Sequence, residues 1–294
     1  MNEIVVWTHG YHFQNTRSFL FPLILFEDYL KKNGVKLSIH EKVYVPKERT
    51  TLFIESNFFG KKFLSNPDEI FKLLRSIKKK FFKIVYFDLS DSTAILHPQI
   101  IKYVDLYSKS QLLIDRNLYK QPFYGNRIFT DFVFRKYKIH DENQSFSKGI
   151  NEDSIKKLVI HWNSGIGNYT YLGRIFDKIY EKIKIKHFIR LPLKNKKSSI
   201  KKKNDLFYNM NVVYSRNTVA WYRKIAFEKL NLSIPKRLLT YKYFLELSKS
   251  KVSLSPFGWG EINYRDYESF INCSLLLKPD MSHLETWPNF FQKK

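Results

Sequence analysis

The sequence S-L-S-P-F-G-W-G-E-I-N-Y-R-D-Y-E-S-F-I-N-C-S-L-L-L-K-P-D-M-S-H-L-E-T-W-P occupies residues 253–288. It predicts a short apolar strand at residues 252–255, a turn-rich loop at 256–260 and a helix from Asn263 to about Asn272. Asn263 is the expected N-cap, and Asp266 stands three residues later, as in a capping box. Because ligands of parallel sheets bind beyond the carboxyl ends of the strands, this junction is a predicted ligand site.

The chemistry of the junction favours a phosphate. Gly258 and Gly260 would let the backbone approach an anion, and the first turn of the helix offers free N–H groups and a positive dipole end. Arg265 would lie beside the phosphate, with Glu268 three residues later on the same helix face. Two plainer interpretations stay open: a glycine turn of purely structural use, and a surface ion-pair set made by Arg265, Asp266 and Glu268.

The same stretch resembles the nucleotide-sugar-binding motif of bacterial glycosyltransferases of the GT-B type, in the exostosin-like and glycosyltransferase family 1-like group. Those proteins carry S-P-x-G-x-G-E and then R-x-x-E, which this chain matches from Ser255 to Glu268. The resemblance implies that Glu268 binds the ribose and that Glu261 is the other acid of the pair, although the two are seven rather than eight residues apart. It is strongest over residues 251–288 and weaker over 214–251.

The resemblance also implies a fold: two Rossmann-like α/β domains facing across a cleft, with the donor held by the second domain. We expect an acceptor-side domain at residues 1–140 and a nucleotide-sugar-binding domain at 157–294, joined by a polar linker at 138–156. The first domain is expected to contain strands at 4–8, 36–40, 51–55, 84–88 and 112–115 and helices at 17–32, 67–80 and 100–108. The second is expected to contain strands at 158–162, 186–191, 211–214 and 252–255, helices at 171–183, 218–230 and 241–250, and a lysine-rich loop at 194–203.

The composition agrees with two folded domains and limits what the charge can mean. The 294 residues are 44% hydrophobic and 17% aromatic, which excludes a mainly disordered chain. The net charge of +24 would ordinarily suggest a nucleic-acid partner or an anionic membrane surface. Only 12 of the 51 basic residues are arginine, however, and the chain is rich in Lys, Asn, Ile, Phe and Tyr, the residues of A+T-rich codons. Codon composition therefore explains much of the charge.

The location is predicted from three features. The single cysteine, Cys273, fits a reducing compartment, and no signal peptide opens the chain. The longest apolar run, residues 19–26, is interrupted by Pro22 and is too short to span a bilayer. We expect a cytoplasmic protein whose positive charge allows peripheral contact with the anionic inner face of the membrane.

Candidate catalytic residues follow two of the expected strands. His9 and His12 come after the first strand, and Asp88 and Asp91 after the fourth, and each is of a type that can serve as general base. Asn163, Gly165 and Gly167, in N-S-G-I-G, are expected to contact the diphosphate. His283 and Glu285 fall short of a metal set, so we expect no metal and no cofactor.

The predicted function is that of a metal-independent, hexosyltransferase-like enzyme that moves a sugar from a nucleotide sugar to a surface-polysaccharide or lipid-linked acceptor. The alternatives are a basic nucleic-acid-binding protein, which ranks well behind because no nucleic-acid motif is present, and an inactive truncated transferase. The last alternative arises because the sequence ends at Lys294, soon after T-W-P, where similar transferases usually continue.

Overall fold

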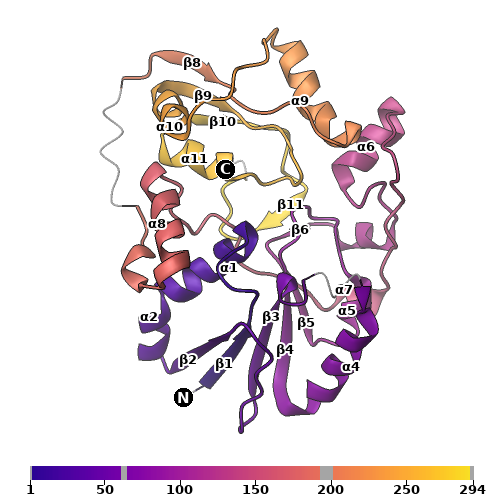
Figure 1. The fold of residues 1–294 in the computed structure, drawn as a ribbon. Helices are drawn as coiled ribbons and strands as arrows, with labels where there is room; N and C mark the ends of the chain where they lie inside the picture. The colour runs from indigo at the N-terminus through magenta and orange to yellow at the C-terminus, as the bar shows by residue number, and fades with distance from the viewer. Residues whose placement is uncertain (1, 61–64, 193–200, 292–294) are drawn as a thin grey trace.

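The main sheet of the protein has six parallel strands. The computed structural model describes residues 2–60, 65–192 and 201–291. The strands lie in the order β2-β1-β3-β4-β5-β7, and each neighbouring pair is parallel (Figure 1). Their bounds are β1 (Asn2–Trp7), β2 (Val35–His40), β3 (Thr50–Glu55), β4 (Phe81–Asp88), β5 (Leu106–Lys109) and β7 (Leu158–Ile160). The expected α/β class with a parallel sheet is confirmed.

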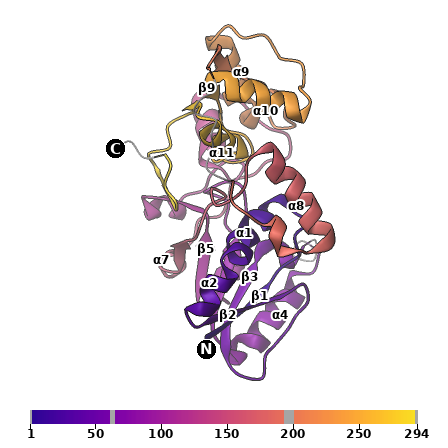
Figure 2. The ribbon, with the colours of Figure 1, turned by 90° about the vertical axis from the view of Figure 1, so that its left-hand side faces the viewer.

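Alternate residues of the central strands pack on opposite faces of this sheet, because successive side chains of a strand point to opposite sides. Ile84 and Tyr86 of β4 share a buried cluster with helix α4 (Pro67–Ile77). Val85 shares another cluster with helix α1 (Gln14–Leu25). The two helices therefore cover opposite faces (Figure 2).

A smaller parallel sheet lies beyond the carboxyl ends of the main strands, in the upper part of Figure 1. Its order is β10-β9-β8, with bounds β8 (Asn204–Phe207), β9 (Ser250–Leu254) and β10 (Leu275–Leu277). Its helices are α9 (Asn217–Lys229), α10 (Thr240–Lys249) and α11 (Tyr264–Ile271). The strand, loop and helix expected around residues 252–272 are therefore present.

The chain then returns to the main unit. Strand β11 (Leu284–Thr286) pairs antiparallel with β6 (Gln111–Leu113), and Trp287 forms a parallel bridge with Trp162. The two sheets are thus joined by a strand pair as well as by the loops between them.

Two predictions in the first half were wrong in detail. The helix expected at 17–32 is divided into α1 and α2 (Glu27–Lys32), because Phe26 leaves helical geometry with φ −99° and ψ 13°. The helix expected at 100–108 is limited to α5 (Pro98–Ile101), and the chain from Leu106 forms β5, since its side chains complete the buried sheet. The described part of the chain also has α6 (Ile128–Tyr137), α7 (Glu152–Ile155) and the short 3₁₀ turns η1 (Ser56–Phe58), η2 (Lys78–Lys80) and η3 (Arg116–Lys120).

The second half departs further from expectation. The strand expected at 158–162 is β7, which pairs with β5 in the main sheet rather than with the smaller sheet. The strands expected at 186–191 and 211–214 are a 3₁₀ turn, η4 (Lys186–Phe188), and a loop. Their apolar residues Ile189 and Val212 are buried in clusters without pairing. Helix α8 (Tyr171–Ile183) has the predicted bounds, and residues 193–200 of the lysine-rich loop lie outside the described residues.

The polar stretch at 138–156, expected as a linker, is held by contacts with both units: Ile150 and Ile155 are buried in the core of the main unit, and Asp141 contacts the second unit. Asp141 is 9% exposed and accepts hydrogen bonds from Arg216 Nε at 3.0 Å and from the Thr218 N–H at 2.9 Å. The carboxylate therefore fixes this stretch to the start of α9.

A buried ion pair joins the ends of β4 and β5. The register places Asp88 opposite Lys109, and Lys109 Nζ lies 3.0 Å from Asp88 Oδ2, with both side chains fully buried. The Ser90 N–H and the Tyr107 hydroxyl donate to the same carboxylate at 2.9 and 2.5 Å. Burial alone would raise the pKa of Asp88, but the Lys109 ammonium together with the hydrogen bonds from Ser90 and Tyr107 outweighs this effect and holds that pKa well below its usual range.

We predict that Lys109→Met destabilises the fold strongly, because it leaves the Asp88 carboxylate buried without its cation. The expected loss in the free energy of unfolding is about 3–5 kcal/mol, measured by urea denaturation. Lys251→Met is the matched control, since its pair with Asp205 is exposed, with side-chain exposures of 57% and 88%. Equal losses in the two variants would contradict this prediction.

Candidate functional site

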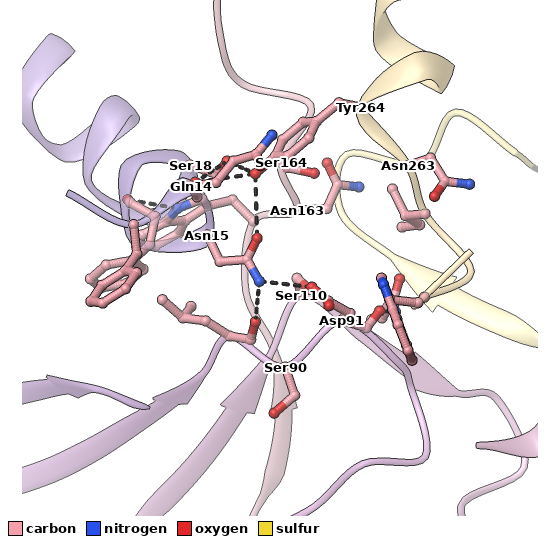
Figure 3. A pocket seen from close by; sticks show the side chains of 18 of the residues that line it. Gln14, Asn15, Ser18, Ser90, Asp91, Ser110, Asn163, Ser164, Asn263 and Tyr264 are labelled. Carbon is pink, nitrogen blue, oxygen red and sulfur yellow. Dashed lines mark hydrogen bonds between the residues drawn. The ribbon is translucent and has the colours of Figure 1, made fainter. Parts of the chain in front are cut away.

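The candidate site is a cavity of about 440 Å³ between the two sheets. It lies at the carboxyl ends of the main strands and is bordered on one side by the loop after β9 (Figure 3). Its lining is made mainly of amide, hydroxyl and aromatic side chains, among them Phe13, Gln14, Asn15, Ser18, Asn57, Ser90, Asp91, Ser110, Asn163, Ser164, Tyr214, Trp259, Asn263 and Tyr264. Such a lining offers both hydrogen bonds and apolar ring faces to a ligand.

Asn15, from the first turn of α1, connects the walls of this cavity. Its Nδ2 donates to the Leu89 carbonyl at 2.9 Å and to Asp91 Oδ1 at 2.8 Å. The Tyr264 hydroxyl at the start of α11 lies 3.4 Å from Asn15 Oδ1 and 2.8 Å from Ser18 Oγ (Figure 3). Segments from both units therefore meet at one group of polar side chains.

Asp91 is the carboxylate that lines this cavity among the described residues, and the side chain is exposed. Asp88, the other acid that the sequence offered as a base, is fully buried and bound to Lys109. Asp88 is the last residue of β4 and Asp91 lies in the loop after it, so the sequence offered both, and their burial distinguishes them. Asp91 has the access that a general base needs, and Asp88 does not.

The two histidines expected near the reaction lie outside the cavity. The His9 N–H donates to Glu55 Oε1 at 2.7 Å, and the His9 ring packs against Phe13 at 4.7 Å. His12 Nδ1 lies 3.1 Å from Glu181 Oε1 on the surface, with 51% of its side chain exposed. Neither lines this cavity or the two smaller ones near α8 and α11, so a catalytic role for either stays a prediction without geometric support.

Glu261 joins the two units. The side chain is fully buried and accepts hydrogen bonds, each 3.0 Å long, from Ser92 Oγ, the Thr93 N–H and Gln111 Nε2. All three donors belong to the main unit. The geometry favours an anchor between the units for Glu261, and its expected contact with the donor stays a prediction.

Gly260 is required by the same contact. A Cβ atom at this position would lie 1.9 Å from the backbone oxygen of Asp91, so the two units approach too closely for a side chain. At Gly258 a Cβ would meet only side-chain ends, with Arg223 Nη2 at 3.0 Å and Asn263 Oδ1 at 3.1 Å. The two glycines expected to let a phosphate approach thus differ. Gly260 allows close contact with the backbone of the main unit, and Gly258 faces polar side chains.

The start of α11 is fixed as the sequence predicted. The Asn263 N–H donates to Asp266 Oδ2 at 2.9 Å, which is half of the expected capping box. Asp266 is itself buried and accepts from Ser255 Oγ at 2.6 Å and from Lys278 Nζ at 3.1 Å. The N-terminal end of α11 therefore has a defined position and direction.

Three arginines surround a further cavity of about 260 Å³ at this helix start. Arg223 Nη1 donates to the Asn211 carbonyl at 2.7 Å, and Arg265 Nη2 donates to the Asn209 carbonyl at 2.9 Å. Burial, together with the nearby Arg265 charge, lowers the pKa of Arg223. Arg174 is the third arginine of the lining and is half exposed. Their charges, with the positive end of α11, make this arginine cavity suited to an anion.

Glu268 lies between the arginine cavity and a second cavity of about 260 Å³ near α1 and α8. It is 2% exposed, accepts from the Tyr243 hydroxyl at 2.7 Å, and forms an ion pair with Arg174. Arg265 and Glu268 line the same arginine cavity, so the structure brings together the basic and acidic residues expected on one helix face.

The N-S-G-I-G loop is also fixed by contacts within the chain. Asn163 is 1% exposed, donates from Nδ2 to the Pro288 carbonyl at 2.6 Å and accepts from the Gly165 N–H at 2.8 Å. A Cβ at Gly165 would lie 2.6 Å from the Phe290 ring. Asn163 lines the main cavity and Gly167 the second one, whereas Gly165 packs against the C-terminal segment.

Within the described ranges, no group of three or more His, Cys, Asp and Glu residues could hold a metal ion. In the same part of the chain, no helix has the length and apolar character needed to cross a membrane. Comparison of the chain with models of known protein families, with curated proteins and with solved structures gave no match.

We predict that Gly260→Ala destabilises the protein by about 2 kcal/mol, because the added methyl group forces the loop away from the Asp91 backbone. The free energy of unfolding from urea titration measures this effect. Gly258→Ala is the control, with an expected cost well below that of Gly260→Ala, since only side-chain ends must move. A larger cost for Gly258→Ala would contradict the assigned contact.

His161, at the floor of the cavity, predicts a pH dependence of stability. Burial, and then the Lys109 charge, lower the pKa of His161 to about 3. Below the ordinary value of about 6.5 the unfolded chain binds a proton that the folded chain excludes, so stability falls as the pH falls from about 6.5 toward 3. His161→Phe keeps a ring beside Phe87. Between about pH 7 and pH 4.5, its free energy of unfolding should fall by about 2 kcal/mol less than that of the wild type.

Urea denaturation at both pH values measures the difference. His187→Phe, at an exposed position, is the matched control. Parallel pH profiles for the wild type and His161→Phe would contradict the assignment.

Proposed function

We propose that the protein is a metal-independent glycosyltransferase of the GT-B type. It transfers a sugar from a nucleotide-sugar donor to a hydroxyl group of a surface-polysaccharide or lipid-linked acceptor. The observation that carries this proposal is the arginine cavity at the start of α11. This helix belongs to the second unit, which faces the carboxyl ends of the strands of the main sheet. The motif at residues 253–288, which resembles that of GT-B enzymes, lies at this position.

On the donor side, the diphosphate lies over the first turn of α11. A departing nucleoside diphosphate carries negative charge, and preorganised cations and N–H groups lower the barrier to its departure. Arg223 and Arg265 supply the charge from positions held by backbone carbonyls, and Arg174 adds a third. In this proposal the positive charge comes from side chains and the helix start, and the step uses no metal ion.

Glu268 binds the ribose. It is buried beside the arginine cavity, and both of its oxygens are occupied by Arg174 and the Tyr243 hydroxyl. Arg174 is half exposed, so it can turn from Glu268 toward a phosphate without disturbing the core. The carboxylate then accepts hydrogen bonds from sugar hydroxyls.

On the acceptor side, Asp91 accepts the proton of the attacking hydroxyl. The oxygen of that hydroxyl forms the new bond to the anomeric carbon, and the bond from that carbon to the nucleoside diphosphate breaks. Asn15 holds Asp91 through a 2.8 Å hydrogen bond and thereby orients the carboxylate in the main cavity. The ring faces of Trp259 and Phe13 at the cavity lining suit the apolar face of a sugar.

We predict that a nucleoside diphosphate raises the melting temperature of the wild type and that Arg265→Gln and Glu268→Gln reduce this shift by at least half. Ligand at about 100 times its Kd adds about 2.7 kcal/mol to stability, which a thermal-shift panel of UDP, GDP, CDP and their sugar conjugates detects. Each variant is compared with its own ligand-free melting temperature, because both residues also make contacts within the chain.

Arg237→Gln is the matched control, since this arginine is exposed and lies outside the arginine cavity. The absence of a shift with every nucleotide of the panel would contradict the proposal. A shift without sugar transfer to any acceptor would instead support the inactive transferase.

A further inference from the structure

Helix α8 carries an apolar stripe that the described chain leaves uncovered. Leu172, Ile175, Ile179 and Ile183 are spaced by three, four and four residues and so share one side of the helix. Leu172, Ile175 and Ile183 are 56%, 38% and 48% exposed, and the helix buries only Gly173 among its described residues. The inward side of α8 is apolar as well, since Tyr180 packs on a buried cluster beside Tyr11, so the exposed stripe is a second apolar side that such a surface helix does not need for its own packing.

The orientation is fixed by the polar side of the helix. The Tyr11 hydroxyl donates to Asp177 Oδ1 at 3.0 Å, and Glu181 pairs with His12 Nδ1 at 3.1 Å and with Arg17 Nη1 at 3.5 Å. Both carboxylates of α8 are therefore engaged by the α1 region, which turns the apolar stripe away from the main unit.

Lysines flank this stripe. Lys178 and Lys182 lie one turn apart along one edge of the stripe, and Lys184 follows its end, all three exposed. Since the acids of the helix face α1, the outward side of α8 combines apolar side chains with positive charge only.

The neighbouring helix extends the surface. Tyr171 contacts Phe244 of α10 with ring centroids 6.2 Å apart, and α10 exposes Tyr241 and Leu245, at 51% and 47%, beside the exposed Lys242. Figures 1 and 2 place α8 and α10 on the same side of the molecule. We call this surface the α8–α10 face.

We propose that the α8–α10 face docks on an anionic lipid bilayer, with the stripe residues inserted at the headgroup boundary and the lysines against lipid phosphates. Apolar side chains bordered by lysines are the arrangement that binds such an interface, through buried apolar area plus attraction to anionic lipid. A second copy of this chain is a poorer occupant, because it would bring lysines against lysines. Lys178 also lines the second cavity, so docking would hold the mouth of that cavity near the bilayer.

Co-sedimentation with sucrose-loaded vesicles tests the docking without any donor or acceptor, so its result is independent of the proposed transferase activity. The purified chain should sediment with vesicles of equal parts phosphatidylglycerol and phosphatidylcholine, and much less with phosphatidylcholine alone. Leu172→Gln/Ile183→Gln should weaken binding to the anionic vesicles by about tenfold or more, through lost apolar burial. Lys178→Gln/Lys182→Gln should weaken it by a similar factor and reduce its salt dependence.

Phe82→Gln/Ile114→Gln is the matched control, with exposures of 68% and 53% at positions outside the α8–α10 face. It should bind like the wild type, and circular dichroism of all variants checks that they fold. Equal binding by the wild type and Leu172→Gln/Ile183→Gln would overturn the proposal, as would equal binding to both kinds of vesicle. A dimer in solution that Leu172→Gln/Ile183→Gln dissociates, without vesicle binding, would also overturn it and would assign the face to a second copy.

Discussion

The position of the second unit over the main sheet depends on the buried carboxylate of Glu261. A carboxylate loses its hydration on burial, and that cost is offset only where enough hydrogen bonds replace the lost water. Ser92, Thr93 and Gln111 supply three such bonds from the main unit. If the second unit moves away, the carboxylate and its donors all lose their partners together. The observed placement of the two units is therefore much more stable than a slightly shifted one.

This constraint determines the candidate site. With the loop around Gly260 held against the Asp91 backbone, Asn263 and Tyr264 at the start of α11 face the ends of the main strands. The Tyr264 hydroxyl meets Ser18 and thereby aligns α11 with α1. The loop between β9 and α11 consequently supplies both the contact that holds the two units together and part of the cavity wall.

Local patterns predicted local structure well, because they depend on contacts a few residues apart. The bounds of α8 and the cap of α11 were visible in the sequence for this reason, as were the strands β1 and β3. The partner of a strand is a different matter. Leu158–Ile160 has the composition of a strand, but nothing in three residues indicates which of two sheets it joins. Apolar residues at 189 and 212 suggested strands and are buried outside any strand instead, since burial alone does not require pairing.

The site was predictable to the extent that its residues follow strands or begin helices. The sequence indicated Arg265 and Glu268 together, and the arginine cavity brings them together. It did not indicate Arg174 and Arg223, which come from distant helices and meet α11 only in the folded chain. Nor did it separate Asp91 from Asp88, because the difference between them is the burial of Lys109 opposite one and not the other.

The main cavity and the arginine cavity differ in charge, and this difference gives the proposed reaction a direction. The described lining of the 440 Å³ cavity includes no lysine or arginine, and its carboxylate is Asp91, whereas the arginine cavity has three guanidinium groups. The arginine cavity therefore suits the anionic diphosphate of the proposed donor, and the 440 Å³ cavity suits the neutral hydroxyl-bearing molecule proposed as acceptor. Tyr264 and Asn263 line both cavities, so the shared wall is the start of α11 itself. A sugar leaving the diphosphate at that helix start would already lie at the boundary that an acceptor hydroxyl reaches from the Asp91 side.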